Sequence, residues 1–530
     1  MLRTELIAPI AVLLRRQAEA RGDNVAFEDP QRSVTYDALL RRTGNLAGHL
    51  AGLSLDPGDR VGLFLPNGVD WVEACFAITR AGCVCVPISF ESTESETRYR
   101  LEDAGCRAIV TTQARLQALA PLQPRLPALA IALVCDAGIV HHLASPARDL
   151  AQDAPHTPPR DLGNIADPSY IIYTSGTTGR AKGVLLNVRG MLWVTAACWA
   201  PICGLSASDR VLSPLPLFHS YALNLTVLST VATGARTFIM SKFSTAEALQ
   251  RLQSGAHTLM PGVPTMFHYL LQRAREEAGA PTAAAPRRLP GVRQCISAGA
   301  IMPATLNRAF EHFFATPLLD GYGITETSTM VTMNWPVGGR VFGSCGIPLP
   351  GLAVRIVDPG GGGDVAPGAE GEVMVRGPNV MLGYHNKPTE TQAALRDGWY
   401  RTGDLARSDD NGFLTITGRL KELIIRGGEN IAPAEIEEVV NAHPCVLDSA
   451  VIGVAHAELG EVPVLFVVAR PGAAIDARDV LAHCAAELSS YKLPQALYVI
   501  AEIPRTGSGK IMRFKLREML SGPAGTQPPA

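Results

Sequence analysis

Short apolar runs alternate with amphipathic stretches through the first 350 residues of the chain. Residues 60–67 (RVGLFLPN) are an apolar run that ends at a turn, residues 69–82 repeat apolar positions with the period of a helix, and residues 83–89 return to an apolar run. Apolar strands joined by helical crossovers are typical of a parallel sheet that is covered on both faces. The pattern recurs up to residue 323 and predicts a large α/β N-terminal domain built on parallel sheets.

The pattern changes near Gly351. Residues 353–377 read as two strands joined by a glycine-rich turn, and residues 398–428 continue in the same style, which indicates antiparallel pairing in a small barrel-like part. Residues 430–520 alternate helix and strand again and predict a small α+β domain. We expect an N-terminal domain over 1–420, a C-terminal domain over 421–520 and a disordered tail over 521–530.

Composition and charge exclude several classes of protein. The 530 residues include 47 Lys and Arg and 49 Asp and Glu, and the net charge of −2 offers no broad surface for nucleic acid. No apolar run reaches the roughly 18 residues that a transmembrane helix needs, and Arg15 and Arg16 interrupt the apolar stretch that a signal peptide would need. None of the 11 cysteines forms a C-x-x-C pair, so we expect a cytoplasmic protein with buried thiols, Cys83 and Cys85 among them.

A glycine- and hydroxyl-rich stretch, SYIIYTSGTTGRAKGV at residues 169–184, is the most informative segment. Glycines let backbone N–H groups turn toward one point, hydroxyls add donors, and a lysine adds a compact positive charge, which together suit a triphosphate. The order of residues differs from the P-loop motif G-x-x-x-x-G-K-[ST]. Without further matches, an ordinary surface linker remains an alternative. The candidate phosphate-binding residues are Thr174, Ser175, Gly176, Thr177, Thr178, Gly179 and Lys182.

The stretch YTSGTTGRAKGV resembles the phosphate-loop signature of the adenylate-forming (ANL) superfamily, which includes acyl-CoA synthetases, nonribosomal-peptide adenylation domains and firefly luciferase. Five further matches follow in the order found in that family, and the six together cover the chain from Thr174 to Arg513. They are LPLFHSYAL at 215–223, GYGITET at 321–327, YRTGDLA at 400–406, GRLKELIIRGGENIAPAEIE at 418–437 and PRTGSGKIMR at 504–513.

The resemblance implies a nucleotide site. Tyr322 would stack on adenine in the space left by the glycines on either side of it, and Glu326 would hold Mg²⁺, which prefers carboxylate and phosphate oxygens. The further implied contacts are Asp320, Gly321 and Gly323 at the adenine, Thr325 at phosphate, and Asp404 and Arg419 at the ribose. Judged alone, Asp404 is as typical of a turn and Arg419 of a surface ion pair.

Two lysines in the C-terminal part have roles by resemblance. Lys421 would be the hinge about which the C-terminal domain changes orientation between half-reactions, and Lys510 would bridge the substrate carboxylate and the α-phosphate during adenylation. After the rotation, a turn formed by Gly427, Gly428, Glu429 and Asn430 would line a tunnel for CoA. Judged alone, Lys510 could belong to a solvated basic cluster, since Lys515 and Arg517 follow it.

The acyl pocket is also assigned by resemblance. His219 would lie between the ATP site and this pocket, although a lone histidine is more often structural. The other candidates are Val263, Ala298, Gly299, Ala300, Ile324 and Val331. None is charged, which favours an uncharged, largely apolar acid over an amino acid, and no arginine for a dicarboxylate can be placed.

The resemblance therefore implies ATP-dependent acid:thiol ligation. A fatty or aryl acid would form an acyl-AMP with release of pyrophosphate, and CoA would then take the acyl group and release AMP, with Mg²⁺ accompanying ATP. The main alternative is loading of a carrier-protein phosphopantetheine, but residues 418–437 lack the insertion usual in such ligases. A luciferase-like oxygenase and a non-enzymatic nucleotide-binding regulator are the other readings, and Lys182 and Lys510 together weigh against the regulator.

Overall fold

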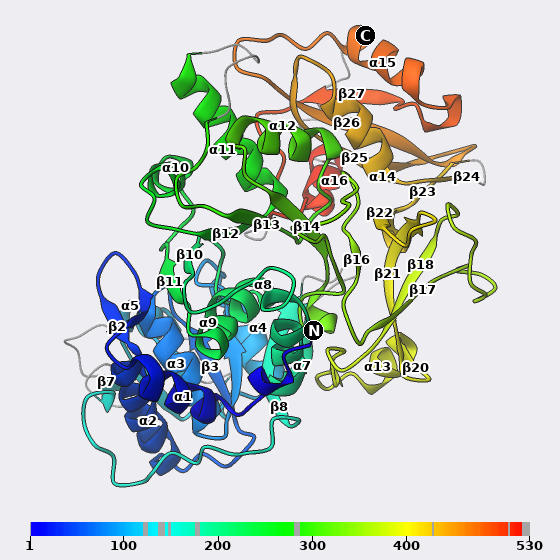
Figure 1. The fold of residues 1–530 in the computed structure, drawn as a ribbon. Coiled ribbons are helices and arrows are strands. Elements are labelled where there is room, and N and C mark those ends of the chain that lie inside the picture. Colours follow the sequence, from blue (N-terminus) through cyan, green and yellow to red (C-terminus); the bar gives the residue numbers. More distant parts are fainter. Residues whose placement is uncertain are drawn as a thin grey trace.

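The structure is a computed structural model that describes residues 2–119, 126–135, 144–146, 150–174, 181–279, 287–426, 429–506 and 509–521. Within these residues, no helix has the length and apolar character needed to cross a membrane. The described chain forms four sheets, three in the N-terminal part and one in the C-terminal part (Figure 1). The boundary expected at residue 420 follows the last strand of the third sheet, and it stays a prediction.

An eight-stranded sheet contains the segment that leads into the phosphate loop. Its order is β19-β9-β8-β4-β3-β5-β6-β7, with parallel pairing from β8 through β7 and antiparallel pairing of β9 with both β8 and β19. The strands are β3 (Arg60–Phe64), β4 (Val84–Pro87), β5 (Ala108–Thr111), β6 (Ile131–Val134), β7 (Ala144–Pro146), β8 (Pro168–Thr174), β9 (Lys182–Asn187) and β19 (Gly383–Tyr384). The phosphate loop therefore connects two strands of a hairpin, an antiparallel arrangement that the parallel pattern did not predict.

A nine-stranded sheet has the order β16-β15-β14-β13-β12-β10-β11-β1-β2. Pairing is parallel from β14 through β1 and antiparallel at both ends. The strands are β1 (Val25–Glu28), β2 (Ser33–Thr35), β10 (Arg210–Ser213), β11 (Arg236–Ile239), β12 (Leu259–Gly262), β13 (Gln294–Ser297), β14 (Leu318–Tyr322), β15 (Thr332–Met333) and β16 (Ile347–Pro348). The apolar runs expected near residues 210, 236, 259, 294 and 318 are thus confirmed as strands.

Two five-stranded sheets complete the fold. The third sheet is antiparallel, in the order β17-β18-β21-β20 with β22 paired to β21, and confirms the antiparallel part. Its strands are β17 (Ala353–Val357), β18 (Gly371–Arg376), β20 (Leu395–Arg396), β21 (Trp399–Ser408) and β22 (Leu414–Arg419). The fourth sheet has the order β24-β23-β26-β25 with β27 paired to β26, and consists of β23 (Ile424–Arg426), β24 (Glu429–Ile431), β25 (Val446–His456), β26 (Gly460–Ala469) and β27 (Ala496–Val499).

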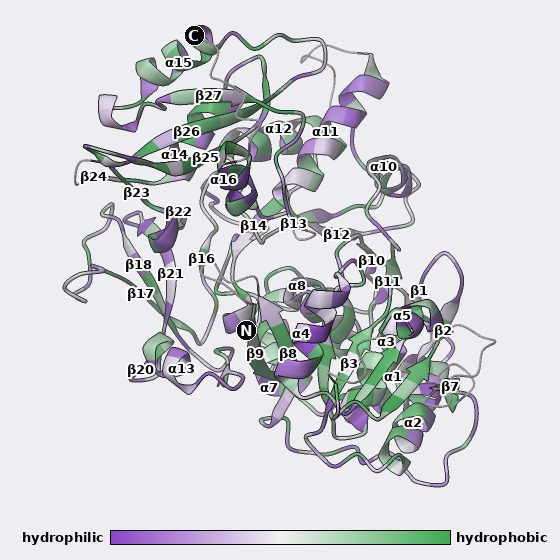
Figure 2. Ribbon diagram, turned by 180° about the vertical axis from the view of Figure 1, so that it is seen from behind, coloured by the Kyte–Doolittle hydropathy of each residue, from purple (hydrophilic) through white to green (hydrophobic). Residues whose placement is uncertain are grey.

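Helices cover the sheets, and the C-terminal sheet lies beside α11 and α12 of the N-terminal part (Figure 1). The strands around β3 are coloured as hydrophobic in Figure 2, consistent with burial between helices. The principal helices are α1 (Ile10–Arg21), α2 (Tyr36–Gly52), α3 (Val69–Arg80), α4 (Glu94–Ala104), α5 (Gln113–Leu119), α7 (Val188–Val194), α8 (Ser220–Ala222), α9 (Ser229–Thr233), α10 (Thr245–Gln253), α11 (Pro264–Ala278), α12 (Ala304–Phe314), α13 (Pro388–Ala394), α14 (Pro433–Asn441), α15 (Ala477–Glu487) and α16 (Arg513–Ser521). Helix α16 ends at Ser521, the first residue of the predicted tail, and 522–530 lie outside the described residues, so the tail stays a prediction.

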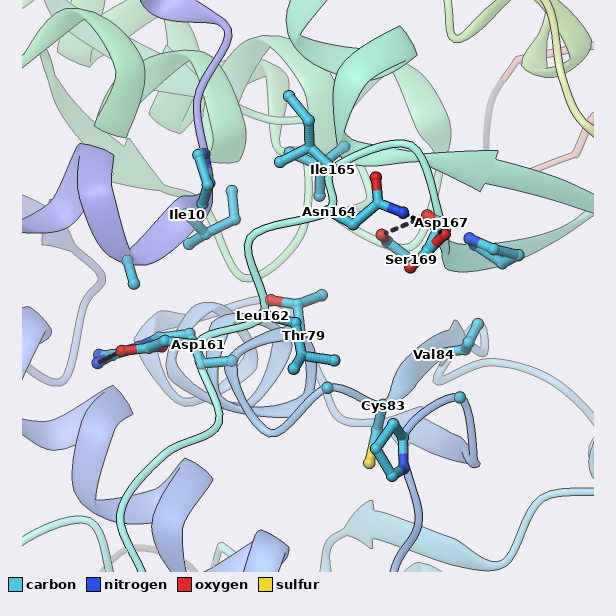
Figure 3. Close-up of a pocket in the computed structure, with 18 residues that line it drawn as sticks. Ile10, Thr79, Cys83, Val84, Asp161, Leu162, Asn164, Ile165, Asp167 and Ser169 are labelled. Carbon is cyan, nitrogen blue, oxygen red and sulfur yellow. Dashed lines mark hydrogen bonds and ion pairs between the residues drawn. The ribbon is translucent and has the colours of Figure 1, made fainter.

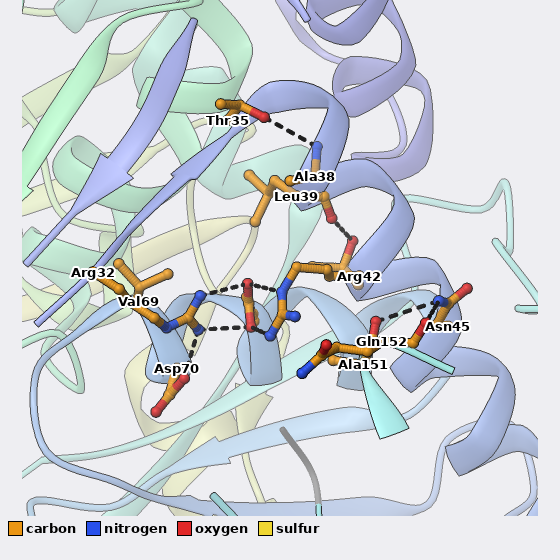
Figure 4. Close-up of polar contacts among 12 residues, drawn as sticks. Arg32, Thr35, Ala38, Leu39, Arg42, Asn45, Val69, Asp70, Ala151 and Gln152 are labelled. Atoms are coloured by element: carbon orange, nitrogen blue, oxygen red, sulfur yellow. Dashed lines mark hydrogen bonds and ion pairs between the residues drawn. The ribbon is translucent and has the colours of Figure 1, made fainter. Parts of the chain in front are cut away.

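A buried ion-pair network links the segment before β2 to helices α2 and α3 (Figure 4). Glu73 of α3 is 3% exposed and accepts hydrogen bonds from two arginines. Arg32 donates to it at 2.8 and 3.1 Å, and Arg42 of α2 donates to it at 2.6 and 2.8 Å. A buried carboxylate needs such pairing, because an unpaired charge in the interior is costly.

The eleven cysteines all lie within the described residues, and none of them forms a disulfide. Ten of them are buried, including Cys83 and Cys85, and Cys445 in the C-terminal part is partly exposed. The predicted burial of the thiols is confirmed for these ten side chains.

Candidate active site

Tyr322, Asp404 and Arg419 form one hydrogen-bonded cluster. The Tyr322 hydroxyl donates to Asp404 Oδ2 at 2.6 Å, and Arg419 Nε lies 2.6 Å from Asp404 Oδ1. Asp404 and Arg419 are brought together because they are register partners on β21 and β22. Burial raises the pKa of Tyr322 well above its usual value, and the neighbouring Asp404 carboxylate adds to this. The hydroxyl therefore stays protonated and acts as a donor.

The glycines on either side of Tyr322 are required for a reason other than the one expected. A Cβ on Gly323 would lie 1.6 Å from the carbonyl oxygen of Thr329, and one on Gly321 would lie 2.4 Å from Met330 Cε. Segment 329–333 folds back against β14, where Gly321 pairs with Met333. We expected these glycines to leave room for a flat ring. The structure instead fills the space beside them with the returning segment 329–333, so that explanation for the glycines is wrong.

Thr325 and Glu326 follow the same strand, in a single helical turn, η5 (Thr325–Thr327). Thr325 is buried and its hydroxyl is 3.2 Å from the hydroxyl of Ser220. Glu326 is partly exposed and accepts a hydrogen bond at Oε1 from the Tyr384 hydroxyl at 3.1 Å. Asp320, two residues before Tyr322 on β14, is buried. Its Oδ1 has no hydrogen-bond partner among the described residues, and burial raises its pKa well above the usual value.

The described ends of the phosphate loop are neighbours. Thr174 ends β8, Lys182 begins β9, and the two are register partners. The Lys182 ammonium lies 5.1 Å from the centre of the Tyr384 ring. Ser175, Gly176, Thr177, Thr178 and Gly179 lie outside the described residues, so their predicted role in phosphate binding stays a prediction.

Lys510 comes from the C-terminal part and reaches the Tyr322 cluster. Burial lowers the pKa of the Lys510 ammonium, the nearby Arg419 charge lowers it further, and Asp404 and Glu326 oppose that shift. The turn that carries Lys510 also touches the N-terminal part, since a Cβ on Gly509 would lie 2.9 Å from Val263 Cγ2. The structure therefore brings residues 509 and 510 near Val263 and Glu326, which lie 246 and 184 positions earlier in the chain.

An ion pair supports this turn. Arg505 donates to both carboxylate oxygens of Asp448, at 2.9 and 3.0 Å, and to the carbonyl oxygen of Gly509 at 2.9 Å. The Lys510 amide donates to the Thr506 hydroxyl at 3.1 Å. Sequence reasoning did not single out Arg505 or Asp448, although Arg505 lies within the quoted stretch PRTGSGKIMR.

His219 precedes α8 and lies near Lys510. Burial is the main reason that its pKa falls from 6.5 to about 4, and the Lys510 charge is the second cause. The imidazole is therefore neutral at neutral pH. The loop before it is fixed by Asn67, which donates to Leu215 O and accepts from Leu217 N–H, each at 3.0 Å.

The residues assigned to the acyl pocket are only partly brought together. A Cβ on Gly299 would lie 3.6 Å from Val263 Cγ1, and Gly509 approaches the same valine. Ala298 packs in the same core cluster as Val263, and Ile324 packs against that cluster. Val331 is completely buried in another cluster, with Tyr322 and Val373, and its place in the pocket stays a prediction. Ala300 is partly exposed.

The residues predicted to form the hinge and the thiol tunnel belong to the segment that leads into the C-terminal sheet. Lys421 is exposed in the short turn η6 (Leu420–Glu422), which separates β22 from β23. Arg513 ties this turn to the C-terminal part, with Nε 3.2 Å from Glu422 and Nη1 2.7 Å from Glu437. Glu429 is exposed at the start of β24, Asn430 is described only as part of that strand, and Gly427 and Gly428 lie outside the described residues.

A cavity of about 300 Å³ lies elsewhere (Figure 3). Its lining includes Cys83 and Ser169, which lie at the beginnings of β4 and β8, whereas Thr174 ends β8. The seven residues of β8 span about 20 Å, so the cavity lies at the end of this strand that is remote from Thr174. Its lining shares no residue with the Tyr322 cluster, and the two are distinct. The Arg80 and Asp161 side chains at its wall pair with each other at 2.8 Å.

Comparison with known proteins identifies the family. The model described as AMP-binding enzyme matches residues 14–385, and the model described as AMP-binding enzyme C-terminal domain matches residues 435–510. The chain belongs to the AMP-binding enzyme family. Two separate matches on either side of the η6 turn agree with a large N-terminal and a small C-terminal part.

Relatives of this AMP-binding enzyme are CoA ligases and synthases. Naringenin synthase of Pestalotiopsis fici is 36% identical over 97% of this chain, which spans only 19% of that protein. Feruloyl-CoA synthase of an Amycolatopsis species is 34% identical over 95% of this chain and 97% of that protein, and sulfoacetate–CoA ligase of Cupriavidus necator is 36% identical over 97% and 98%. A crystal structure of an anthranilate CoA ligase in complex with anthranoyl-AMP has a TM-score of 0.89 at 26% identity, with 98% of both chains covered. This AMP-binding enzyme is thus an AMP-forming acyl-CoA synthetase, and CoA is the co-substrate that the family implies.

The lowered pKa of His219 predicts how the stability of this acyl-CoA synthetase depends on pH. Between pH 6.5 and about 4, the unfolded chain binds a proton at His219 that the folded protein does not, so the free energy of unfolding falls as the pH falls. We expect the thermal midpoint of His219→Asn to fall less steeply over this range. Burial also lowers the pKa of His257 to about 4, so the variant keeps part of the slope. An identical slope in the variant would contradict a buried neutral His219.

Proposed function

We propose that this acyl-CoA synthetase activates an uncharged, largely apolar carboxylic acid, fatty or aryl, with ATP and transfers it to CoA. A carboxylate oxygen attacks the α-phosphorus of ATP and pyrophosphate leaves. The CoA sulfur then attacks the acyl carbon, the thiol proton is released, and AMP leaves. The observation that carries this proposal is that Lys510 lies within electrostatic reach of Arg419, Asp404 and Glu326.

Lys510 has the chemistry that the first step needs. A carboxylate and a triphosphate repel each other, and negative charge gathers on the α-phosphate in the transition state, so an ammonium between the two anions favours reaction. Its neighbour Arg419 supplies a second positive charge, which its ion pair with Asp404 holds in place. In this proposal Tyr322 contacts adenine and Asp404 and Arg419 contact the ribose, with Asp320, Gly321 and Gly323 at the adenine edge.

Mg²⁺ fits the donors that are present only as a partner of ATP. Among the described residues there is no group of three or more His, Cys, Asp or Glu side chains that could hold a metal by itself. Glu326 is one partly exposed carboxylate, and Mg²⁺ is commonly held by one or two carboxylates together with substrate phosphates. Glu326 would thus hold Mg²⁺, which would neutralise charge on the phosphates, while Thr325 and Lys182 contact the phosphates directly.

The surroundings of Val263 support an uncharged acid. Val263, Ala298 and Gly299 are apolar, and His219 is neutral at neutral pH. An amino acid would require a carboxylate for its ammonium group, and a dicarboxylate would require a cation for its second carboxylate. Ala300 and Ile324 complete the proposed pocket, in which the acid points its carboxylate toward Lys510.

The second half-reaction is proposed to use another orientation of the C-terminal domain. With Lys510 at the Tyr322 cluster, the thiol needs a path to the same acyl carbon, and rotation about Lys421 would remove Lys510 and bring up the turn at 427–430. Lys421 is exposed and lies between two sheets, which suits a hinge. Gly427, Gly428, Glu429 and Asn430 would then line the path of the pantetheine arm.

A panel of carboxylic acids tests the proposal. Acid-dependent exchange of pyrophosphate into ATP is expected with an apolar fatty or aryl acid, followed by CoA-dependent release of AMP. Release of ADP and orthophosphate would overturn the reaction type. Acylation of a phosphopantetheine carrier protein in place of CoA would instead support the acyl-AMP ligase alternative, and absence of exchange with every acid would indicate a nucleotide-binding regulator.

Removal of the Glu326 charge should alter the metal requirement. Because an amide oxygen binds Mg²⁺ more weakly than a carboxylate does, we expect Glu326→Gln to need about tenfold more Mg²⁺ for half-maximal exchange, a loss comparable to that of one hydrogen bond to a charged group. The measurement is a magnesium titration of pyrophosphate exchange at constant ATP. An unaltered titration would remove Glu326 from the proposed metal site.

A further inference from the structure

Tyr384 lies between strand β9, which follows the phosphate loop in the sequence, and the turn that carries Glu326. It is on β19, which pairs antiparallel with β9 so that Tyr384 stands opposite Val184. The His385 amide donates to Gly183 O at 2.8 Å, and the Met381 amide donates to Glu326 O at 2.8 Å. One short segment is therefore hydrogen-bonded to both the strand after the phosphate loop and the turn that carries the proposed metal-binding carboxylate.

The Tyr384 side chain contacts both charged groups. Its hydroxyl donates to Glu326 Oε1 at 3.1 Å, and the Lys182 ammonium lies 5.1 Å from the centre of its ring. The hydroxyl of Tyr400 is 3.4 Å from that of Tyr384 and belongs to the same network. Lys182 and Glu326, both of which the structure describes, form no ion pair with each other.

A lysine and a glutamate that contact the same side chain could also pair with each other. Such a pair would direct the ammonium at the carboxylate and away from the phosphates. An aromatic ring attracts an ammonium to its face, and a phenol donates to a carboxylate, so a tyrosine between them satisfies each without joining them.

We propose that Tyr384 is a positioning residue for adenylation, which holds Lys182 on its ring face and Glu326 on its hydroxyl so that the two charges stay separate and face the triphosphate and its Mg²⁺. This inference rests on the proposed function. The ring and the hydroxyl of Tyr384 act on different partners, so their effects can be separated by substitution.

Tyr384→Phe tests the hydroxyl and Tyr384→Leu tests the ring. Tyr384→Phe keeps the ring on Lys182 and should raise the Mg²⁺ concentration for half-maximal pyrophosphate exchange about tenfold, the effect of losing a hydrogen bond to a charged group. The KM for ATP at saturating Mg²⁺ should change less than about twofold, because the cation–π contact is retained. Tyr384→Leu should raise both quantities.

A binding measurement without turnover separates positioning from general damage. Calorimetric titration measures binding of a non-hydrolysable ATP analogue in the absence of acid, with and without Mg²⁺. The increase in affinity that Mg²⁺ causes should be about tenfold smaller for Tyr384→Phe than for the unmodified enzyme, and the affinity without metal should be the same. Tyr173→Phe is the matched control. It removes a hydroxyl on β8 that donates to another carboxylate, Asp103 of α4, at 2.7 Å, and it should leave both affinities unchanged.

The outcomes distinguish this inference from the proposed function. If the unmodified enzyme shows no acid-dependent exchange, the proposed function is wrong and the inference falls with it. If the enzyme exchanges pyrophosphate and Tyr384→Phe has an unchanged magnesium dependence in both assays, the positioning role alone is wrong. The phenylalanine variant keeps the ring and every backbone hydrogen bond, so it decides the hydroxyl role even if Tyr384→Leu does not fold.

Discussion

Lys510→Ala is expected to slow acyl-adenylate formation by about 100- to 1,000-fold, the effect of removing one preorganised charge donor from a transition state. Thioester formation from supplied acyl-AMP and CoA should change little, because no charge has to gather on a triphosphate in that step. Pyrophosphate exchange measures the first half-reaction, and release of AMP from purified acyl-AMP measures the second.

Lys515→Ala provides the control for this variant. Lys515 is an exposed lysine five positions further along, on α16, so its removal changes the net charge equally without reaching the Tyr322 cluster. Equal losses in both half-reactions of Lys510→Ala would show that the substitution damages the C-terminal domain as a whole. The role assigned to the Lys510 ammonium would then be wrong.

Lys421→Pro is expected to have the opposite selectivity. Proline fixes φ near −65° and disfavours helical backbone at the residue before it, Leu420, so the η6 turn should be restricted to fewer orientations. We expect the rate of thioester formation to fall about 100-fold, because a misplacement of the reacting groups by about an ångström has an effect of this size. The rate of pyrophosphate exchange should fall much less. Single-turnover transfer from acyl-AMP to CoA provides the measurement.

Lys421→Ala separates backbone restriction from loss of charge. Alanine keeps the φ freedom of the native residue, and the lysine side chain is exposed, so this variant should retain both half-reactions. If Lys421→Pro transfers the acyl group as fast as the unmodified enzyme, rotation does not take place at this position. If the alanine variant loses transfer as well, the charge rather than the backbone is responsible.

Local pattern was enough to predict the strands but not how they pair. The apolar runs at β10 through β14 were predicted, because a strand buried on both faces is apolar throughout. The hairpin of β8 and β9 was not, because periodicity within a segment carries no information about the direction of its neighbour. The same limitation explains Gly321 and Gly323, whose small size is required by a segment that returns six to nine residues later.

The candidate site was predicted as a set of motifs and not as a set of contacts. Asp404 and Arg419 were named from their motifs, but their ion pair depends on the register of β21 and β22. Tyr384 and Arg505 were missed because each acts through a partner remote in sequence, Glu326 in one case and Asp448 in the other. A valine looks alike in a pocket and in a core, so the sequence does not reveal that Val331 packs in the cluster with Tyr322.

The distribution of thiols offers an experimental opportunity. Ten cysteines are buried and one, Cys445, is partly exposed on the C-terminal side of the hinge. A maleimide fluorophore should therefore attach preferentially at Cys445 without any engineered cysteine. Its emission would provide an optical record of the C-terminal domain as acid, nucleotide and CoA are added in turn.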